Sequence, residues 1–196
     1  MHDHEKYLKI EIPKRFYSDS AGEPFKQCQV CGRSLHAPGV TYVVEKAMKN
    51  YPGYDFSSTV YELAICLDCH QKVQQGMSEE SVKNLQLYYQ SVMEKKGQHQ
   101  VFIDMRTFNL DDWFSTCFFK GSEISKMSEY QMVAQFEGDK MLMTTPPLII
   151  GSEAMNEMSS LLSDKTIDDM NDFRNRFMGP SPEIEELIYG KKLLLL

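Results

Sequence analysis

Four cysteines in two closely spaced pairs constrain this chain more than any other feature. Cys28 and Cys31 are separated by two residues, Cys66 and Cys69 likewise, and 34 residues lie between the pairs. A two-residue gap lets two sulfur atoms occupy two corners of a tetrahedron, each about 2.3 Å from a metal ion. Two such pairs complete a closed site without an open position for water, so the spacing predicts one structural zinc ion. Four thiolates also suit iron, which leaves iron as an alternative to zinc.

The residues around the two pairs predict how the chain would bring them together. Residues 25–32 have the pattern of a short turn, in which Gly32 allows the left-handed backbone that points amide groups toward sulfur. β-Branched and aromatic residues predict strands over 41–44 and 58–65, with a turn at 50–54 between them. A helical pattern starts at the second pair. The alternative is that the four cysteines are free and buried.

The order of these elements resembles a treble-clef zinc finger: a C-x2-C turn, a hairpin, and a second C-x2-C at the start of a helix. In this arrangement the amino-terminal end of the helix places partial positive charge near Cys66 and Cys69, which favours the thiolate forms. Binding of an ion to such a site would contribute on the order of 10 kcal/mol to folding.

The segment 28–73 also resembles the core of cysteine-rich HNH endonucleases. Residues 28–32 match the C-x-x-C-G turn of that family, and residues 65–72 approximate its L-C-x-x-C-H-x-x-K signature, with Lys72 one place early. The family requires a histidine general base at the end of the first strand, where this chain has Val44-Glu45-Lys46-Ala47. The resemblance implies that Glu45 could hold a metal ion and that His70 takes the place of the late histidine. It therefore implies a degenerate HNH-like module.

The whole chain is expected to be an α+β protein, with a treble-clef zinc module followed by a small antiparallel-sheet domain that ends in three helices. The expected parts are an amino-terminal arm (1–24), the four-cysteine module with its following helix (25–97), and an acidic α+β domain (98–196). The arm contains a short alternating strand pattern at Leu8, Ile10 and Ile12. Whether the two larger parts share one core stays open.

Local signals predict the remaining elements. Ser78 is a suitable N-cap for a helix that Gly97 ends. In the second half, strands are expected over 101–108 and 113–120, followed by a hairpin of 130–137 and 140–145, after which Pro146-Pro147 closes the strand region. Three helices are then expected: Ser152 to Ser163, a helix with Thr166 as N-cap that ends at Gly179, and Ser181 to Gly190.

Charge and hydropathy restrict the classes of partner and compartment. The net charge is −7, and residues 1–98 are neutral, with 12 basic and 12 acidic residues, so all of the excess lies in 99–196. Nucleic-acid binders usually carry a basic patch, and none stands out here. No apolar run approaches the roughly 20 residues that cross a bilayer, and no signal-peptide pattern follows Met1. We therefore expect a cytoplasmic protein that does not insert into a membrane.

These observations favour a zinc-stabilised protein-interaction or adaptor protein without catalytic activity. The acidic second half is rich in methionine, an adaptable contact residue, and ends in Leu193 to Leu196, four leucines that favour contact with a partner or self-association. Cys117 has apolar neighbours and is expected to be a core residue. A degenerate HNH-like module that binds or cuts nucleic acid is the alternative. An enzyme with its site wholly within 98–196 is a third possibility.

Overall fold

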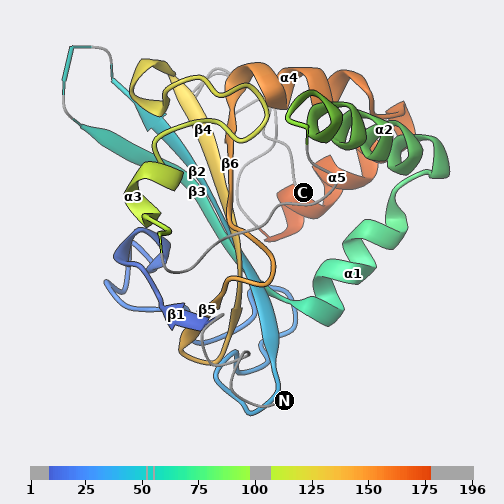
Figure 1. Cartoon of the computed structure of the whole chain (residues 1–196). Helices are drawn as coiled ribbons and strands as arrows, with labels where there is room; N and C mark the ends of the chain where they lie inside the picture. The colour runs from blue at the N-terminus through green and yellow to red at the C-terminus, as the bar shows by residue number, and fades with distance from the viewer. Residues whose placement is uncertain (1–8, 52, 55, 98–106, 178–196) are drawn as a thin grey trace.

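The structure, a computed structural model, describes residues 9–51, 53–54, 56–97 and 107–177. Within these ranges the protein is a mixed α+β structure with five α-helices and an antiparallel sheet, and most of the helices lie to one side of the sheet (Figure 1). The strands are β1 (Lys9–Glu11), β2 (Thr41–Asn50), β3 (Ser57–Cys66), β4 (Glu129–Glu137), β5 (Lys140–Leu142) and β6 (Leu148–Gly151). The helices are α1 (Leu67–Gly76), α2 (Glu79–Lys95), α3 (Leu110–Trp113), α4 (Ser152–Ser160) and α5 (Asp164–Phe177).

Strands β2 and β3 form a long hairpin that ends at Cys66, the first residue of the second cysteine pair. They pair in register from Tyr42 opposite Cys66 to Asn50 opposite Ser57, with one irregularity between Ala47 and Met48. The two strands predicted from β-branched and aromatic residues are therefore confirmed, and both are longer than predicted. Because β3 runs directly into α1, the hairpin places the start of α1 at one end of the sheet.

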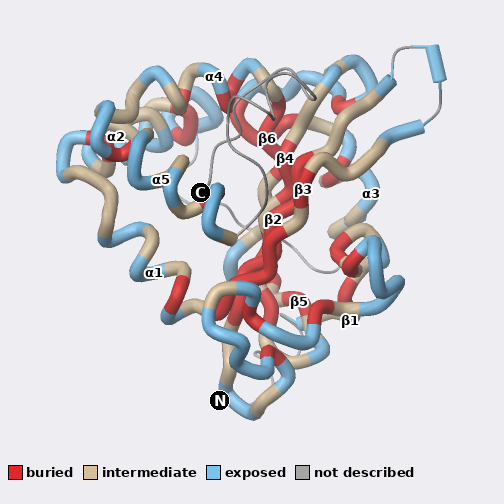
Figure 2. Tube along the Cα trace, turned by 180° about the vertical axis from the view of Figure 1, so that it is seen from behind, coloured by how far each residue is buried: buried red, intermediate tan, exposed pale blue. Residues whose placement is uncertain are grey.

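The sheet joins strands from both sides of the boundary expected near residue 97. Its order is β1-β5-β4-β2-β3, with β6 also paired to β4, so β2 of the first part pairs along its length with β4 of the second. Tyr42 stacks on Phe136, and Phe16 packs edge-on against the same ring. The buried strands form the centre of the molecule (Figure 2). The division into separate domains stays a prediction.

The two faces of the sheet have different coverings. Tyr42 and Lys46, which point to one face, contact the amino-terminal segment: Tyr42 belongs to the aromatic cluster of Phe16, and the Lys46 ammonium group donates to the carbonyl oxygen of Tyr17. Glu45 and Leu63 point to the opposite face, where they line a cavity together with residues of α1 and α5. Helices α1 and α5 therefore lie over the face that carries Glu45.

Serine and threonine side chains connect the starts of α2 and α5. Ser78 caps α2 as predicted, because its hydroxyl oxygen accepts from the Ser81 amide at 3.1 Å. The prediction that Thr166 caps α5 is wrong, since α5 already begins at Asp164. The Thr166 hydroxyl instead accepts from the Ser78 amide at 2.9 Å, and Ser163 accepts from the Thr166 amide at 3.3 Å. This tertiary contact explains why Thr166 is fully buried.

Two expectations for the second half are wrong. Residues 113–120 do not form a strand, because Asn109 accepts from the amides of Asp111 and Asp112 and caps the short helix α3, after which the chain turns. Pro146-Pro147 does not end the strand region either, since β6 follows and pairs with β4. The β4–β5 hairpin and the helix from Ser152 are confirmed.

Other expectations concern residues outside the described ranges. They are most of the strand at 101–108, the end of the α5 helix at Gly179, the helix from Ser181 to Gly190 and the tail Leu193 to Leu196. Within the described ranges, no helix combines the length and apolar composition that crossing a membrane requires.

Candidate metal centre

The first cysteine pair lies on a tight turn that precedes the sheet. The Cys28 amide donates to the Arg33 carbonyl oxygen, and the Gly32 amide donates to the Cys28 carbonyl oxygen, both at 2.8 Å. Gly32 has a φ of 72°, a left-handed conformation that a glycine adopts without the steric cost of a Cβ atom. The turn therefore holds Cys28 and Cys31 in one compact loop, as the sequence predicted.

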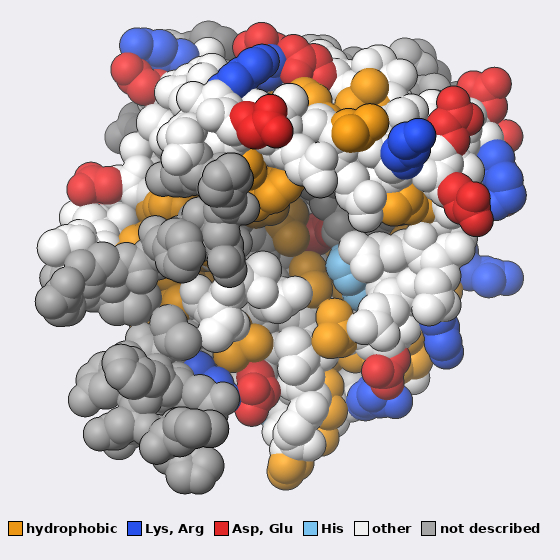
Figure 3. All heavy atoms as spheres, turned by 45° about the vertical axis from the view of Figure 1, so that its right-hand side comes forward, with side chains coloured by type: hydrophobic (Ala, Val, Ile, Leu, Met, Phe, Trp, Pro, Cys, Tyr) orange, Lys and Arg blue, Asp and Glu red, His pale blue; other side chains and the backbone are white. Residues whose placement is uncertain are grey.

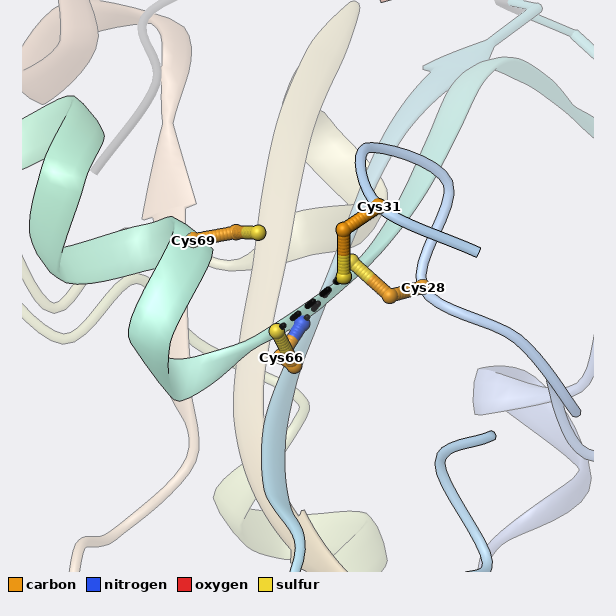
Figure 4. A group of neighbouring side chains, drawn as sticks. All are labelled: Cys28, Cys31, Cys66 and Cys69. Atoms are coloured by element: carbon orange, nitrogen blue, oxygen red, sulfur yellow. Dashed lines mark hydrogen bonds between the residues drawn. The ribbon is translucent and has the colours of Figure 1, made fainter. Parts of the chain in front are cut away.

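The second pair lies at the junction of β3 and α1. Cys66 ends β3 with an extended backbone and is the N-cap of α1, while Cys69 lies in the first turn of that helix. The two-residue gap therefore changes the chain from strand to helix, and both sulfur atoms face the turn that carries the first pair (Figure 4). The predicted helical pattern at this pair is confirmed.

The four sulfur atoms converge on one point. All lie within 4.8 Å of one another, and the Cys31 and Cys66 sulfur atoms are 3.8 Å apart (Figure 4). A tetrahedral zinc site with bonds of about 2.3 Å has sulfur atoms about 3.8 Å apart, so this pair already has the separation of two zinc ligands. Cys28, Cys66 and Cys69 are buried, whereas Cys31 is exposed. The four side chains could hold one metal ion.

The surroundings of the cysteines change the pKa values of three thiols. A backbone hydrogen bond from Arg33 lowers the pKa of Cys31 to about 7, with burial opposing this change. Burial raises the pKa of Cys66 and of Cys69. The Cys66 amide donates to the Cys28 sulfur atom at 3.4 Å, which links the two pairs directly. A bound dication would favour thiolates at all four positions.

Two contacts that the sequence did not suggest fix the first pair against the second. The Gln29 amide donates to the Ala64 carbonyl oxygen at 3.0 Å, and the Gln29 side-chain oxygen accepts from the Ala64 amide. Arg33 forms an ion pair with Asp68 in the first turn of α1. Because β3 ends the strand order, Gln29 satisfies an amide and a carbonyl group at this edge of the sheet. No sequence motif marks Gln29 for this role.

Two of the residues singled out by the HNH resemblance, Glu45 and His70, lie close together, and His70 directly follows Cys69 in α1. Glu45 of β2 and His70 of α1 line the same small cavity, of about 20 Å³, between the sheet and the helices. Glu45 is 1% exposed and accepts from Tyr61 and Gln131. A cavity of this size has room for about one water molecule and not for a phosphodiester group. Lys72 is exposed and does not line this cavity.

Cys117, the fifth cysteine, is a core residue, as its apolar neighbours suggested. It is 1% exposed, packs in the cluster beneath α2 and α4, and its sulfur atom accepts from the Gly151 amide at 3.3 Å. Its position is separate from the cluster of four cysteines.

The chain was compared with protein-family models, with curated proteins and with solved structures, and none of these comparisons found a match. The resemblance to HNH endonucleases therefore has no support beyond the residues that carry it. The class that the fold and the site define is an α+β protein with a cluster of four cysteines that could bind a metal ion.

Proposed function

We propose that this protein is a cytoplasmic protein-interaction or adaptor protein without catalytic activity, stabilised by one zinc ion bound to Cys28, Cys31, Cys66 and Cys69. The observation that carries the proposal is the convergence of four sulfur atoms from two separate segments, three of them buried. Four thiolates fill all positions of a tetrahedral ion and leave none for a substrate or a catalytic water. The role of the ion is therefore to hold the fold.

The position of the ion supports a role as a structural connector of a treble-clef type. It would join the turn at Cys28 to the end of β3 and the first turn of α1, which belong to a separate segment of the chain. Loss of the ion would release the start of α1 from the turn. Zinc is proposed ahead of iron because a closed four-thiolate site without redox chemistry is the usual form of a structural zinc site.

Surface composition supports the interaction part of the proposal. Large apolar side chains are exposed on α2 and on the β2–β3 hairpin, including Tyr54 at 79%, Phe56 at 62% and Leu87 at 53%. An apolar cleft also adjoins the cysteine cluster. Exposed apolar groups of this size are often contact sites for other proteins. The acidic charge of 99–196 favours a protein partner over nucleic acid.

A degenerate HNH-like module is the second candidate, because Glu45 and His70 line one cavity. The burial of Glu45, which is 1% exposed, argues against its direct contact with a phosphate. A nicking assay with added divalent metal distinguishes the candidates: activity that is lost in a His70→Ala variant with its metal still bound would establish the HNH-like role. Absence of cleavage at all metal concentrations is the result expected from the adaptor proposal.

The proposal is tested by affinity purification of the tagged full chain from its native host. We expect a stoichiometric protein partner that survives nuclease treatment, identified by mass spectrometry, and weaker capture after deletion of Leu193 to Leu196. Nuclease-sensitive nucleic acid without a protein partner would overturn the proposal.

A further inference from the structure

An apolar cleft of about 320 Å³ lies between α1 and α5, directly beside the cysteine cluster. Val30 of the first cysteine turn and Cys69 form part of its wall. Figure 3, which turns the helical side of the molecule forward, shows hydrophobic side chains gathered around a hollow on this side. The volume lies at the lower end of the range of about 300–1,000 Å³ that binding pockets have.

Each helix presents one face to the cleft. The lining residues of α1 recur at spacings of three and four, at Cys69, Lys72, Val73 and Gly76, and the C-cap residue Met77 continues the pattern. Those of α5 follow the same pattern, at Thr166, Asp169, Met170, Phe173, Arg176 and Phe177. The walls are therefore continuous helical faces. Because four of their apolar residues also line the small cavity that contains Glu45, they form the floor that separates the cleft from the sheet.

The charges at the cleft are opposite to the charge of the chain. Lys72 and Arg176 are exposed, and neither forms an ion pair with any residue of the described ranges. Asp169, the one acidic residue of the lining, pairs with Lys165 at 2.9 Å, so its charge is already balanced. The cleft therefore offers two positive charges that have no ion-pair partner in the part of the chain that the structure describes, beside apolar walls, in a protein with a net charge of −7.

We propose that this cleft binds an amphipathic segment of a protein partner, with large apolar side chains between α1 and α5 and an acidic side chain at Lys72 and Arg176. The inference rests on the proposed interaction function, and it specifies which side chains of the partner the cleft would bind. An apolar helix face in a groove is a common mode of peptide recognition, and charge complementarity at the rim selects the partner. Since Val30 and Cys69 belong to the wall, a bound ion would also fix the shape of the cleft.

Gly76 allows the cleft to be blocked without disturbing the fold. It ends α1 on the face that lines the cleft, its φ is not positive, and a Cβ atom added there would meet no heavy atom within 4 Å. A Gly76→Leu side chain would occupy the space expected for the partner. Gly76→Ala is the matched control, because it gives a similar gain in helix propensity while leaving most of the cleft empty.

The experiment uses a phage-displayed library of random peptides, selected on the zinc-loaded full chain. We expect enriched peptides that combine large apolar residues with Asp or Glu. Their affinity should be unchanged for Gly76→Ala and at least about tenfold weaker for Gly76→Leu, a loss that corresponds to about 1.4 kcal/mol. Lys72→Glu should also weaken binding, whereas Lys83→Glu on the exposed side of α2, a change of equal charge away from the cleft, should not.

The inference is overturned if no peptide is enriched, or if enriched peptides bind Gly76→Leu as tightly as the unchanged protein. Failure of the inference and failure of the proposed function are distinguishable. A partner found by affinity purification that binds Gly76→Leu normally would leave the interaction function in place and exclude this cleft as its site. If that purification captured no protein partner, the result would contradict the proposed interaction function itself.

Discussion

The sulfur atoms of Cys31 and Cys66 lie 3.8 Å apart, although one cysteine belongs to a turn before the sheet and the other to the end of β3. This separation equals the distance between two thiolates on one tetrahedral zinc ion, which is about 3.8 Å. The turn has its own backbone hydrogen bonds and is fastened to β3 through Gln29. The fold therefore brings the ligands to the geometry that an ion requires.

Replacing one ligand should remove the ion and destabilise the protein. A Cys66→Ser variant is expected to lose metal and several kcal/mol of the free energy of unfolding, because binding of a structural ion contributes to folding stability, on the order of 10 kcal/mol in zinc-finger peptides. Metal analysis and urea unfolding measure the two effects. Cys117→Ala is the control, with metal content unchanged. Equal metal content in the Cys66→Ser variant and the unchanged protein would disprove the ligand assignment.

Metal affinity should fall steeply as pH falls. Burial raises the pKa of Cys66 and of Cys69, so in the metal-free protein both thiols are protonated at neutral pH and must release protons when they bind an ion. For each thiol that must lose a proton, the apparent affinity for the ion falls about tenfold when the pH falls by one unit. For two such thiols the affinity therefore falls roughly a hundredfold per pH unit. Competition with a chelator at pH 8, 7 and 6 measures this dependence. An affinity that does not change with pH would contradict the assignment.

Gln29 should stabilise the turn without being needed for the ion. Gln29→Ala removes the acceptor of the Ala64 amide, which belongs to a fully buried residue, and should cost about 1–2 kcal/mol of the free energy of unfolding. The protein should still bind one equivalent of metal. Gln71→Ala, on an exposed position of α1, is the control and should leave stability unchanged. Equal stabilities of the two variants would show that the Gln29 contact is not formed.

The buried Lys46 should be essential to the attachment of the amino-terminal segment. Its ammonium group, 3% exposed, forms ion pairs with Asp19 and with Glu62 and donates to the Tyr17 carbonyl oxygen at 2.8 Å. Lys46→Ala would leave the partly buried Glu62 without this cation and should lower the free energy of unfolding by about 3 kcal/mol. Denaturant unfolding measures the loss.

The control for Lys46 is Lys126→Ala. Lys126 is 73% exposed and pairs with Glu123 three residues earlier, so its loss should change stability by less than about 0.5 kcal/mol. A similar effect of the two substitutions would contradict the structural role of Lys46.

The sequence predicted elements that local patterns determine. The cysteine spacing, the two long strands, the Ser78 cap and the β4–β5 hairpin all follow from residues close together in the chain. The strand predicted over 113–120 was wrong because the side chain of Asn109 caps a short helix, and local apolar content does not distinguish a strand from buried turns. Thr166 was misassigned because α5 begins two residues earlier, where the Ser163 hydroxyl accepts from the Thr166 amide; the contact of Thr166 with Ser78 is distant in sequence and no local pattern indicates it.

The sequence predicted the four cysteine ligands of the candidate site, but not the residues that hold these ligands in place. Two C-x2-C pairs have a known meaning in metal binding, so the four cysteines could be named from spacing. Gln29 acts through its contact with Ala64, and the cleft exists because α5 packs beside α1. These are long-range arrangements, which no local pattern of residues encodes. The pairing of β2 with β4 across the expected domain boundary is another long-range arrangement that local patterns do not encode.

Metal analysis of the purified full chain, by inductively coupled plasma mass spectrometry, tests the central claim most directly. The account predicts one equivalent of zinc per chain in the unchanged protein and none in a variant that combines Cys28→Ser with Cys66→Ser. One equivalent of iron per chain would support the four-cysteine site and identify its ion as iron in place of zinc. A protein that is folded, contains neither metal and takes up none when zinc is added would contradict the account.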